Sequence, residues 1–528
     1  MRNARTIDIA RCLRSVLLCT LVAAPCGASA ATRAVATEGG DLNGVRQGGV
    51  VVFRGIQYAA APSGEWRWRP PQPVQRQVGV RAADSFGAFC PQSGRAIALF
   101  AGIPMDEDCL HLNVYMPAAA FDGGKPVPVM VWIHGGSFRS SAGSWSGAEP
   151  FALVHKGVAV VTINYRLGRL GLFAHPALAA AAPADELQGN YSLMDQIAAL
   201  RWVQRNIAAF GGDPARVTIF GQSAGGVSVT TLMAVPAARG LFQGAIAQSG
   251  SSRIEGDRPL RGPRGYFESL EDDGLRMAAA MGIENGADAA RRLRALPVAD
   301  LLAYSAKEIP NSMNPVVDGR LLPDSISTLF RRGRQNPVPF LAGTTDWEAS
   351  LIAPYPFTLE DILAGATDPA QARAAYPGFT DGALKSAWFT DMLFAAPARF
   401  LLGEMARVDQ PAWLYRFSYV PEARRDKVSG AAHSDDEPYV FNDLHMRGYW
   451  PQDAVPTPAD WRMARLVSDY WVNFAKRGDP NGVGLPHWPR YDSKTDLSLE
   501  LGTQIEAVEP ARIEQLRFHD RRYDSALR

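Results

Sequence analysis

The fold is decided by residues 216–225, which read Arg216-Val217-Thr218-Ile219-Phe220-Gly221-Gln222-Ser223-Ala224-Gly225. The first five residues are rich in β-branched and aromatic side chains, which is typical of a buried strand. The next five match the pattern G-x-S-x-G, and residues 226–234 can form a helix. A strand, a tight turn and a helix in this order predict that the turn presents the Ser223 hydroxyl as a nucleophile.

Glycine on both sides of Ser223 has a steric reason. A sharp strand-to-helix turn brings backbone so close to Gly221 and Gly225 that a Cβ atom would not fit. The same turn forces the serine into a strained conformation with its Oγ exposed. Because a serine hydroxyl is a weak nucleophile at its ordinary pKa, it needs a histidine base and a carboxylate that orients the histidine.

Strands and helical segments alternate along the chain before residue 230. Residues 127–133 and 158–164 are apolar runs that predict buried strands, and residues 195–210 carry apolar side chains at helical spacing. This alternation predicts the α/β class, with a mostly parallel central sheet, flanking helices and long insertions. The chain has no linker, repeat or low-complexity tract, so we expect residues 31–528 to form one domain.

The base should be a histidine that follows Ser223, because after this type of turn the chain supplies first the acid and then the histidine. We favour His433, which lies in a loop of small residues able to deliver an imidazole to the site. His445 is expected to be structural. His487 and His519 stand in polar and aromatic contexts typical of a surface.

The acid should follow another buried strand. Residues 338–343 form such a strand, and both Asp346 and Glu348 come directly after it, so the residues alone leave this choice open. Three more carboxylates, at residues 435–437, follow His433 closely. They either stabilise the protonated imidazole or form a solvated or helix-capping cluster that points away from it.

A glycine turn follows the first predicted strand, at residues 134–138 (His-Gly-Gly-Ser-Phe). Such a turn presents backbone N–H groups to the oxyanion that develops when an ester carbonyl is attacked. Each donor lowers the barrier by roughly 3 kcal/mol. The sequence therefore predicts nucleophile, base, acid and oxyanion donors for acyl transfer.

Residues 1–30 have the features of a secretory signal peptide. Four arginines precede a short apolar run at residues 15–24, and Ala28-Ser29-Ala30 matches an A-x-A cleavage site. The run is about half the ~20 residues that a membrane-spanning helix needs. We therefore expect a secreted or periplasmic protein without a stable membrane anchor. Outside this leader only Cys90 and Cys109 remain, and an even pair in an exported chain predicts a disulfide.

Charge and composition exclude other classes. Lys and Arg number 54 and Asp and Glu 53, so the net charge of +1 provides no field to attract a phosphate backbone, and nucleic acid is not an expected partner. An apolar content of 47% with 20% charged residues is typical of a globular protein with a large core.

These motifs resemble the type-B carboxylesterase family, which includes bacterial esterases, fungal lipases and cholinesterases, over roughly residues 38–495. Residues 53–59, 107–114, 210–214, 248–250 and 478–481 also carry the resemblance. It implies an α/β-hydrolase fold, a small-molecule ester substrate, an acyl-enzyme intermediate and no metal or organic cofactor. The site residues that it implies are the triad Ser223, Glu348 and His433, the oxyanion donors Gly136, Ser137 and Ala224, the disulfide Cys90–Cys109, and Ser249 as a partner of the histidine or the acid. Gln222, next to the nucleophile, is also expected to support the catalytic residues.

The sequence departs from the family pattern at several positions. Ser137 stands where the family usually has Gly or Ala, Gln222 replaces the usual Glu before the nucleophile, and Ala349 replaces a Gly after the acid. Between Cys90 and Cys109 there is no tryptophan of the kind that binds quaternary ammonium groups in cholinesterases, so such substrates are disfavoured.

Two alternatives to a carboxylesterase remain. The apolar run at residues 96–103, inside the disulfide loop, is either a wall of the pocket mouth or a lid, and a lid would indicate a lipase. Some members of this fold have lost the triad and act as binding proteins. Because Ser223, Glu348 and His433 are all present here, an enzyme is the favoured interpretation.

Overall fold

The computed structural model describes residues 32–94, 102–144, 149–251, 258–262, 268–307, 313–364, 368–446, 450 and 454–526. The predicted signal peptide, residues 1–30, lies outside the described residues. So do residues 96–101 of the apolar run that is expected to form a wall of the pocket mouth or a lid. No helix in the described part of the chain is long and apolar enough to cross a membrane.

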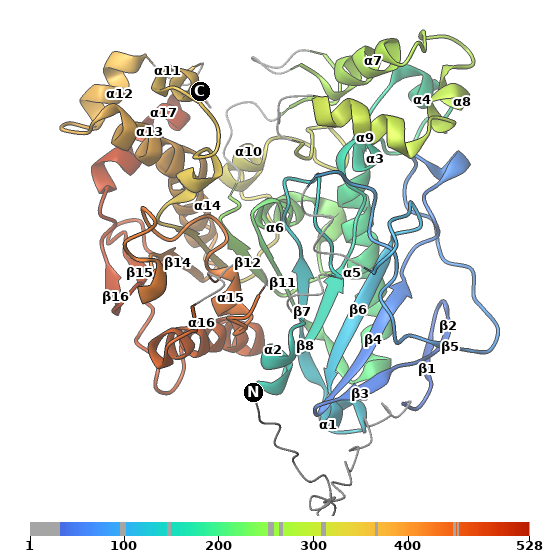
Figure 1. Ribbon diagram of the computed structural model, residues 1–528, viewed down its shortest axis with the longest axis horizontal. Helices are drawn as coiled ribbons and strands as arrows, with labels where there is room; N and C mark the ends of the chain where they lie inside the picture. Colours follow the sequence, from blue (N-terminus) through green and yellow to red (C-terminus); the bar gives the residue numbers. More distant parts are fainter. Residues whose placement is uncertain are drawn as a thin grey trace, which may run out of the picture.

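A large sheet forms the centre of the described structure (Figure 1). Its strands are β3 (Val45–Gln47), β4 (Val50–Gln57), β6 (His111–Pro117), β7 (Val127–Ile133), β8 (Ala159–Ile163), β11 (Gly212–Gln222), β12 (Gly244–Gln248), β13 (Phe340–Thr345), β14 (Ala412–Phe417), β15 (Ser498–Leu501) and β16 (Ile505–Val508). Two small sheets contain β1 (Val35–Thr37), β2 (Gly40–Asn43) and β5 (Val80–Ala82), and β9 (Leu172–Phe173) and β10 (Gly189–Asn190).

The helices lie around this sheet. The α-helices are α1 (Ala118–Phe121), α2 (Phe151–His155), α3 (Gly168–Gly171), α4 (Pro176–Ala180), α5 (Tyr191–Phe210), α6 (Ala224–Ala234), α7 (Leu270–Ala280), α8 (Ala289–Arg294), α9 (Val298–Lys307), α10 (Ile326–Arg331), α11 (Leu359–Leu363), α12 (Pro369–Ala375), α13 (Asp381–Thr390), α14 (Ala396–Ala406), α15 (Glu437–Val440), α16 (Pro458–Arg477) and α17 (Ile513–Ala526). The short 3₁₀ helices are η1 (Gly64–Trp66), η3 (Pro236–Ala238), η4 (Glu348–Leu351) and η6 (Glu422–Arg424), and η5 (Asp391–Ala395) is a π-helix.

The order of strands in the large sheet is β16-β15-β14-β13-β12-β11-β7-β8-β6-β4-β3. All neighbours from β15 to β8 are parallel, and the remaining pairs at both edges are antiparallel. The α/β-hydrolase fold with a mostly parallel centre is therefore confirmed. Parallel strands place their carboxyl ends at one edge of the sheet, so the loops after β7, β11, β12 and β13 lie near one another.

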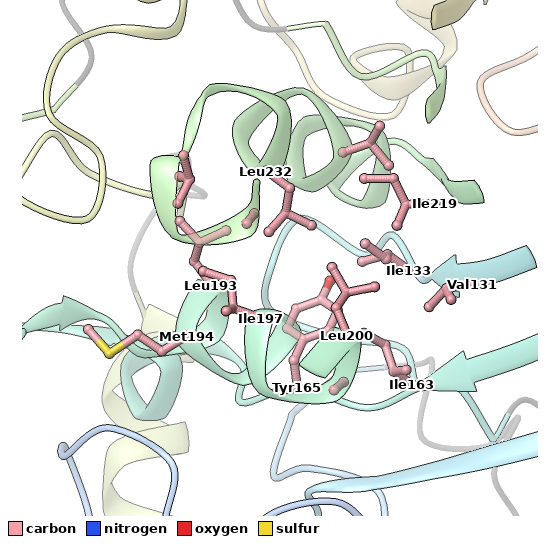
Figure 2. Packing of buried hydrophobic residues seen from close by; sticks show 14 of the residues in the cluster. Val131, Ile133, Ile163, Tyr165, Leu193, Met194, Ile197, Leu200, Ile219 and Leu232 are labelled. Atoms are coloured by element: carbon pink, nitrogen blue, oxygen red, sulfur yellow. The ribbon is translucent and has the colours of Figure 1, made fainter. Parts of the chain in front are cut away.

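The central strands are buried on both faces. Along β7, Val129, Val131 and Ile133 pack into one core cluster with α5 and α6, as Figure 2 shows for Val131 and Ile133. Met130 and Trp132 point to the other face and pack into a second cluster with α16. Because alternate residues of a strand face opposite sides, burial on both sides requires the continuous apolar run seen at residues 127–133.

Helix α5 begins four residues earlier than the predicted start at residue 195. Residues 191–194 are all buried, so the helix has no polar face there and lacks the amphipathic period on which the prediction depends. The helix ends at Phe210. Gly211, the next residue, has a φ of 101°, a left-handed conformation that glycine adopts without a steric penalty.

The insertions form two groups of helices. Figure 1 shows α7, α8 and α9 on one side of the molecule, and α11, α12, α13 and α17 on the other. The predicted disulfide is present: Cys90 and Cys109, both buried, are bonded with Cα atoms 4.9 Å apart.

Candidate active site

Ser223 lies in the turn between β11 and α6. Its φ of 57° and ψ of −125° place a non-glycine residue in a strained conformation, and its side chain is half-buried. A Cβ at Gly221 would lie 2.6 Å from the Ile133 carbonyl oxygen, and one at Gly225 would lie 2.0 Å from the same oxygen. The steric reason predicted for the two glycines is therefore confirmed.

Glu348 begins η4, the short helix after β13, and is fully buried. Its Oε2 lies 2.5 Å from Nδ1 of His433, and its Oε1 accepts a hydrogen bond from the Thr345 N–H at 2.8 Å. One carboxylate oxygen is thus held by the backbone, and the other holds the imidazole ring. This arrangement fixes the ring orientation and assigns the proton to Nδ1, which leaves Nε2 as an acceptor.

Asp346, the other candidate for the acid, contacts different groups. Its Oδ1 accepts a hydrogen bond from the Ala431 N–H at 2.7 Å, and its Oδ2 lies 3.5 Å from Nη2 of Arg416. The backbone of the same loop pairs with the histidine loop, since the Trp347 N–H donates to the Ala431 carbonyl. Asp346 therefore ties together the two loops that carry Glu348 and His433, and does not contact the imidazole through its carboxylate.

The Nε2 atom of His433 contacts Gln222 in this structure. The Nε2 atoms of the two side chains are 3.2 Å apart, so the Gln222 amide donates to the ring nitrogen that is free to accept. Among the described residues, no group forms a hydrogen bond with Ser223 Oγ. The ring of Phe394, from the π-helix η5, covers the imidazole at a centroid distance of 5.6 Å.

The glycine turn after β7 lies against the Ser223 turn. A Cβ at Gly135 would be 3.2 Å from Ser223 Cβ, and one at Gly136 would be 2.1 Å from the Ser140 carbonyl oxygen. Gly136 and Ser137 have φ values of 94° and 56°. The N–H groups of Gly136, Ser137 and Ala224 donate to no other group among the described residues, so they are available to a developing oxyanion.

The interpretation of the carboxylates after His433 as a solvated cluster was wrong for two of them, Asp435 and Asp436, because both are buried. Asp436 is fully buried, and its Oδ2 accepts hydrogen bonds from Gln248 Nε2 and the Tyr415 hydroxyl, both at 2.9 Å. Burial raises the pKa of Asp436 to about 6. Asp435 is also buried and pairs with Arg424 at 3.1 Å.

Other predicted residues lie in different surroundings from those expected. Ser249 is buried next to β12, but its hydroxyl has no hydrogen-bond partner in the described structure, so the expected contact with the histidine or the acid is not formed. The expected surface position of His519 was wrong: it is buried, and its Nε2 lies 2.9 Å from the Tyr376 hydroxyl. Burial lowers the pKa of His519 to about 3. His445 is exposed rather than structural, and His487 is exposed as predicted.

The contacts that sequence reasoning missed are those of Gln222 and Phe394 with His433. Gln222 was expected to support the catalytic residues, but its contact with His433 was not predicted, and nothing in the local sequence of η5 indicates that Phe394 covers the imidazole. Among the described residues, no group of three or more His, Cys, Asp or Glu side chains is placed to hold a metal ion.

Comparison with known proteins identifies the family. A model of the carboxylesterase family matches residues 31–374 and 381–519. The chain belongs to the carboxylesterase family. It is 34% identical over 493 residues to para-nitrobenzyl esterase of Bacillus subtilis (strain 168), covering 89% of this chain and 95% of that protein.

Other relatives agree with this assignment. Fumonisin B1 esterase of Sphingopyxis macrogoltabida is 33% identical over 486 residues, covering 89% of this chain and 86% of that protein. A solved structure of a PNB esterase is 31% identical and superimposes with a TM-score of 0.81, covering 92% of this chain and 99% of that chain. This member of the carboxylesterase family is a carboxylic ester hydrolase.

Proposed function

We propose that this carboxylesterase hydrolyses small-molecule esters through an acyl-enzyme on Ser223, with His433 as the base and Glu348 as the residue that orients it. The observation that carries this proposal is the 2.5 Å contact between His433 Nδ1 and the fully buried Glu348, with the strained Ser223 in the neighbouring turn. A buried carboxylate, an imidazole that it orients and a serine that the substrate can reach are the three parts that acyl transfer needs.

The proposed reaction has two stages. Ser223 Oγ attacks the ester carbonyl while its proton passes to His433 Nε2, and the N–H groups of Gly136, Ser137 and Ala224 stabilise the oxyanion. The carbon–oxygen bond to the alcohol then breaks, and the alcohol leaves with the proton from His433. Water, activated by the same imidazole, next attacks the acyl-enzyme and releases the acid and free Ser223.

One contact must change before the first stage. Nε2 of His433 has to exchange the Gln222 amide for the Ser223 hydroxyl. Catalytic hydrogen bonds are often long or absent without substrate and form only in the complex. We therefore place Gln222 as a residue that holds the imidazole in the resting enzyme.

Replacement of the nucleophile tests this function. Ser223→Ala removes the hydroxyl without removing core volume, and turnover of para-nitrophenyl butyrate should fall on the order of a millionfold. Ser327→Ala is the control, because Ser327 is a buried serine that lies on α10, outside the site. A fluorophosphonate probe should label the Ser223 peptide of the wild type. If Ser223→Ala keeps a tenth of wild-type turnover, or the label resides on another residue, the proposal is wrong.

We also propose that residues 1–30 are removed on export to the periplasm or medium, and that residues 31–528 form one carboxylesterase domain. The leader pattern supports export, and so does the disulfide, because such bonds persist in oxidising compartments. Sequencing the amino terminus of the exported protein should give a start at Ala31. A mature chain that keeps residues 1–30 would contradict this proposal.

A further inference from the structure

A cavity of about 310 Å³ lies beside the glycine turn. Gly136 and Ser137, two of the proposed oxyanion donors, line it, and leucines from the α3 region and from α9 supply apolar walls. The glycine turn lies close to Ser223, because a Cβ built at Gly135 would be 3.2 Å from Ser223 Cβ. A chemical group in this cavity can therefore belong to the same substrate molecule whose ester bond lies at Ser223.

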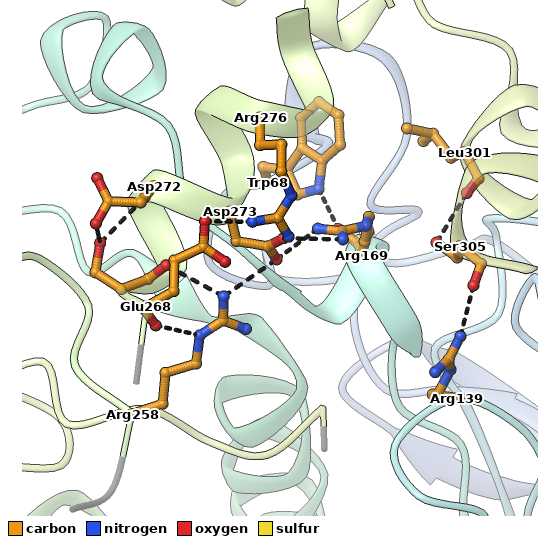
Figure 3. A network of polar contacts seen from close by, with 11 residues as sticks. Trp68, Arg139, Arg169, Arg258, Glu268, Asp272, Asp273, Arg276, Leu301 and Ser305 are labelled. Atoms are coloured by element: carbon orange, nitrogen blue, oxygen red, sulfur yellow. Dashed lines mark hydrogen bonds and ion pairs between the residues drawn. The ribbon is translucent and has the colours of Figure 1, made fainter. Parts of the chain in front are cut away.

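The residues that line this cavity include two arginines, Arg139 and Arg169, and no carboxylate among the described residues. Arg169 already has a carboxylate partner, because it is buried and its two terminal nitrogens bind Asp273 at 2.6 and 3.0 Å (Figure 3). Burial alone would raise the pKa of Asp273, but its hydrogen bonds and ion pairs with arginines outweigh burial and lower that pKa. Asp273 is thus a carboxylate partner of Arg169, which it shares with Arg258 and Arg276.

Arg139 has different surroundings. Its side chain is half-buried, and Nη2 donates to the Ser305 carbonyl oxygen at 2.7 Å, as Figure 3 shows. No carboxylate among the described residues pairs with it. A guanidinium carries five N–H donors, so most of those on Arg139 have no protein acceptor in the described structure. The cavity therefore contains one guanidinium, that of Arg139, that has no carboxylate partner among the described residues.

A guanidinium without a carboxylate partner favours a particular ligand chemistry. Its planar fork of donors matches the two oxygens of a carboxylate, and hydrogen bonds to charged groups are about twice as strong as neutral ones. In a half-buried cavity the attraction between opposite charges is several times stronger than in bulk water. Ser93 and Ser137 also line the cavity, and a serine hydroxyl can donate to the same anion.

We propose that this cavity binds a free carboxylate carried by the ester substrate itself, with Arg139 as its main partner. Esters that contain an unesterified acid group, such as half-esters of dicarboxylic acids, are then the preferred substrate class. This inference rests on the proposed ester hydrolysis at Ser223 and adds a determinant of specificity. Arg139 acts on substrate binding and takes no part in the proton transfers.

Two matched pairs of esters test the proposal with the purified protein. In the first pair the carboxylate is on the acid part: para-nitrophenyl hydrogen glutarate is compared with para-nitrophenyl pentanoate. In the second pair it is on the alcohol part: para-carboxyphenyl butanoate is compared with phenyl butanoate. The measured quantity is the ratio of kcat/KM for the anionic ester to kcat/KM for the neutral ester.

Arg139→Gln should lower this ratio about 10- to 100-fold in one of the two pairs, the range expected for loss of one hydrogen bond to a charged group. The pair that responds shows which part of the substrate occupies the cavity. Arg139→Lys keeps the charge without the planar fork and should recover part of the ratio. Arg201→Gln is the matched control, since Arg201 lines a separate cavity that contains none of the site residues, and it should leave both ratios unchanged.

The outcomes separate this inference from the proposed function. If the wild type hydrolyses the neutral esters but Arg139→Gln changes neither ratio, the carboxylate subsite is wrong while ester hydrolysis stands. If Arg201→Gln lowers a ratio as much as Arg139→Gln does, the preference comes from the general field of the surface, and the subsite is again wrong. If the wild type hydrolyses none of the four esters, the proposed function itself is wrong.

Discussion

The side-chain amide of Gln222 lies 3.2 Å from His433 Nε2, the atom that the proposed mechanism assigns to the proton of Ser223. Most members of the family are expected to carry a glutamate at this position, next to the same nucleophile. A neutral amide donates a hydrogen bond to the neutral ring, whereas a carboxylate would attract the protonated ring. The residue before the nucleophile therefore affects the pH at which the base becomes available.

Gln222→Glu should move the acid limb of the pH profile upward. A carboxylate within 4 Å stabilises the imidazolium, so the ring loses its proton, and becomes able to act as a base, only at higher pH. The limb of kcat/KM for a neutral ester should shift by about one pH unit or more. Gln222→Met, which has a similar size and no charge, should not shift the limb upward. A glutamate variant with the wild-type profile would contradict this prediction.

Glu348→Gln and Asp346→Asn should differ strongly in activity. Only Glu348 contacts the imidazole, and a carboxylate in that role is worth roughly 10⁴ in turnover. Asparagine at position 346 keeps an oxygen that can accept from the Ala431 N–H, so we expect a loss of about tenfold or less. Steady-state rates with para-nitrophenyl butyrate decide the question. Should Asp346→Asn be the more impaired variant, the assignment of the acid is wrong.

Asp436→Asn should stabilise the protein more at neutral than at acidic pH. Because burial raises the folded pKa of Asp436 to about 6, above the ~3.9 of an unfolded chain, the wild type loses stability as pH rises between these values. The loss is complete above the folded pKa and amounts to about 3 kcal/mol. Asparagine does not ionise and can keep one acceptor for Gln248 or Tyr415.

Urea unfolding at about pH 4 and about pH 8 measures this effect. The free energy of unfolding of Asp436→Asn, relative to wild type, should rise between the two pH values by up to about 3 kcal/mol. Asp300→Asn, at an exposed position on α9, is the control and should show no such rise. A difference between Asp436→Asn and wild type that stays constant with pH would mean that the buried carboxyl group does not titrate in this range.

The double variant Cys90→Ala, Cys109→Ala should be less stable than the oxidised wild type by about 3 kcal/mol, because a closed loop of this length restricts the unfolded chain. Both cysteines are buried, and alanine introduces no polar group at either position. Reduced wild-type protein should unfold at nearly the same urea concentration as the double variant. Equal midpoints for the oxidised wild type and the variant would contradict a stabilising disulfide.

The sequence by itself determined the elements whose signals are local. The apolar run at residues 127–133 coincides with β7, because a strand buried on both faces needs an unbroken apolar sequence. The glycines around Ser223 were predicted for a steric reason that neighbouring residues impose, and the structure confirms it. Among four candidate histidines, His433 was favoured because small residues stand beside it, and it is the one that contacts Glu348.

Only the tertiary structure decided which groups from distant segments meet. Asp346 and Glu348 stand two residues apart on one loop, and their sequence does not say which of them points at an imidazole 85 residues away. The same limit explains the contact of Gln222 with His433, the burial of Asp436 and the hydrogen bond of Arg139 to the Ser305 carbonyl. These features depend on how loops and insertions pack against one another, and packing contacts leave no periodic signal in the segments that make them.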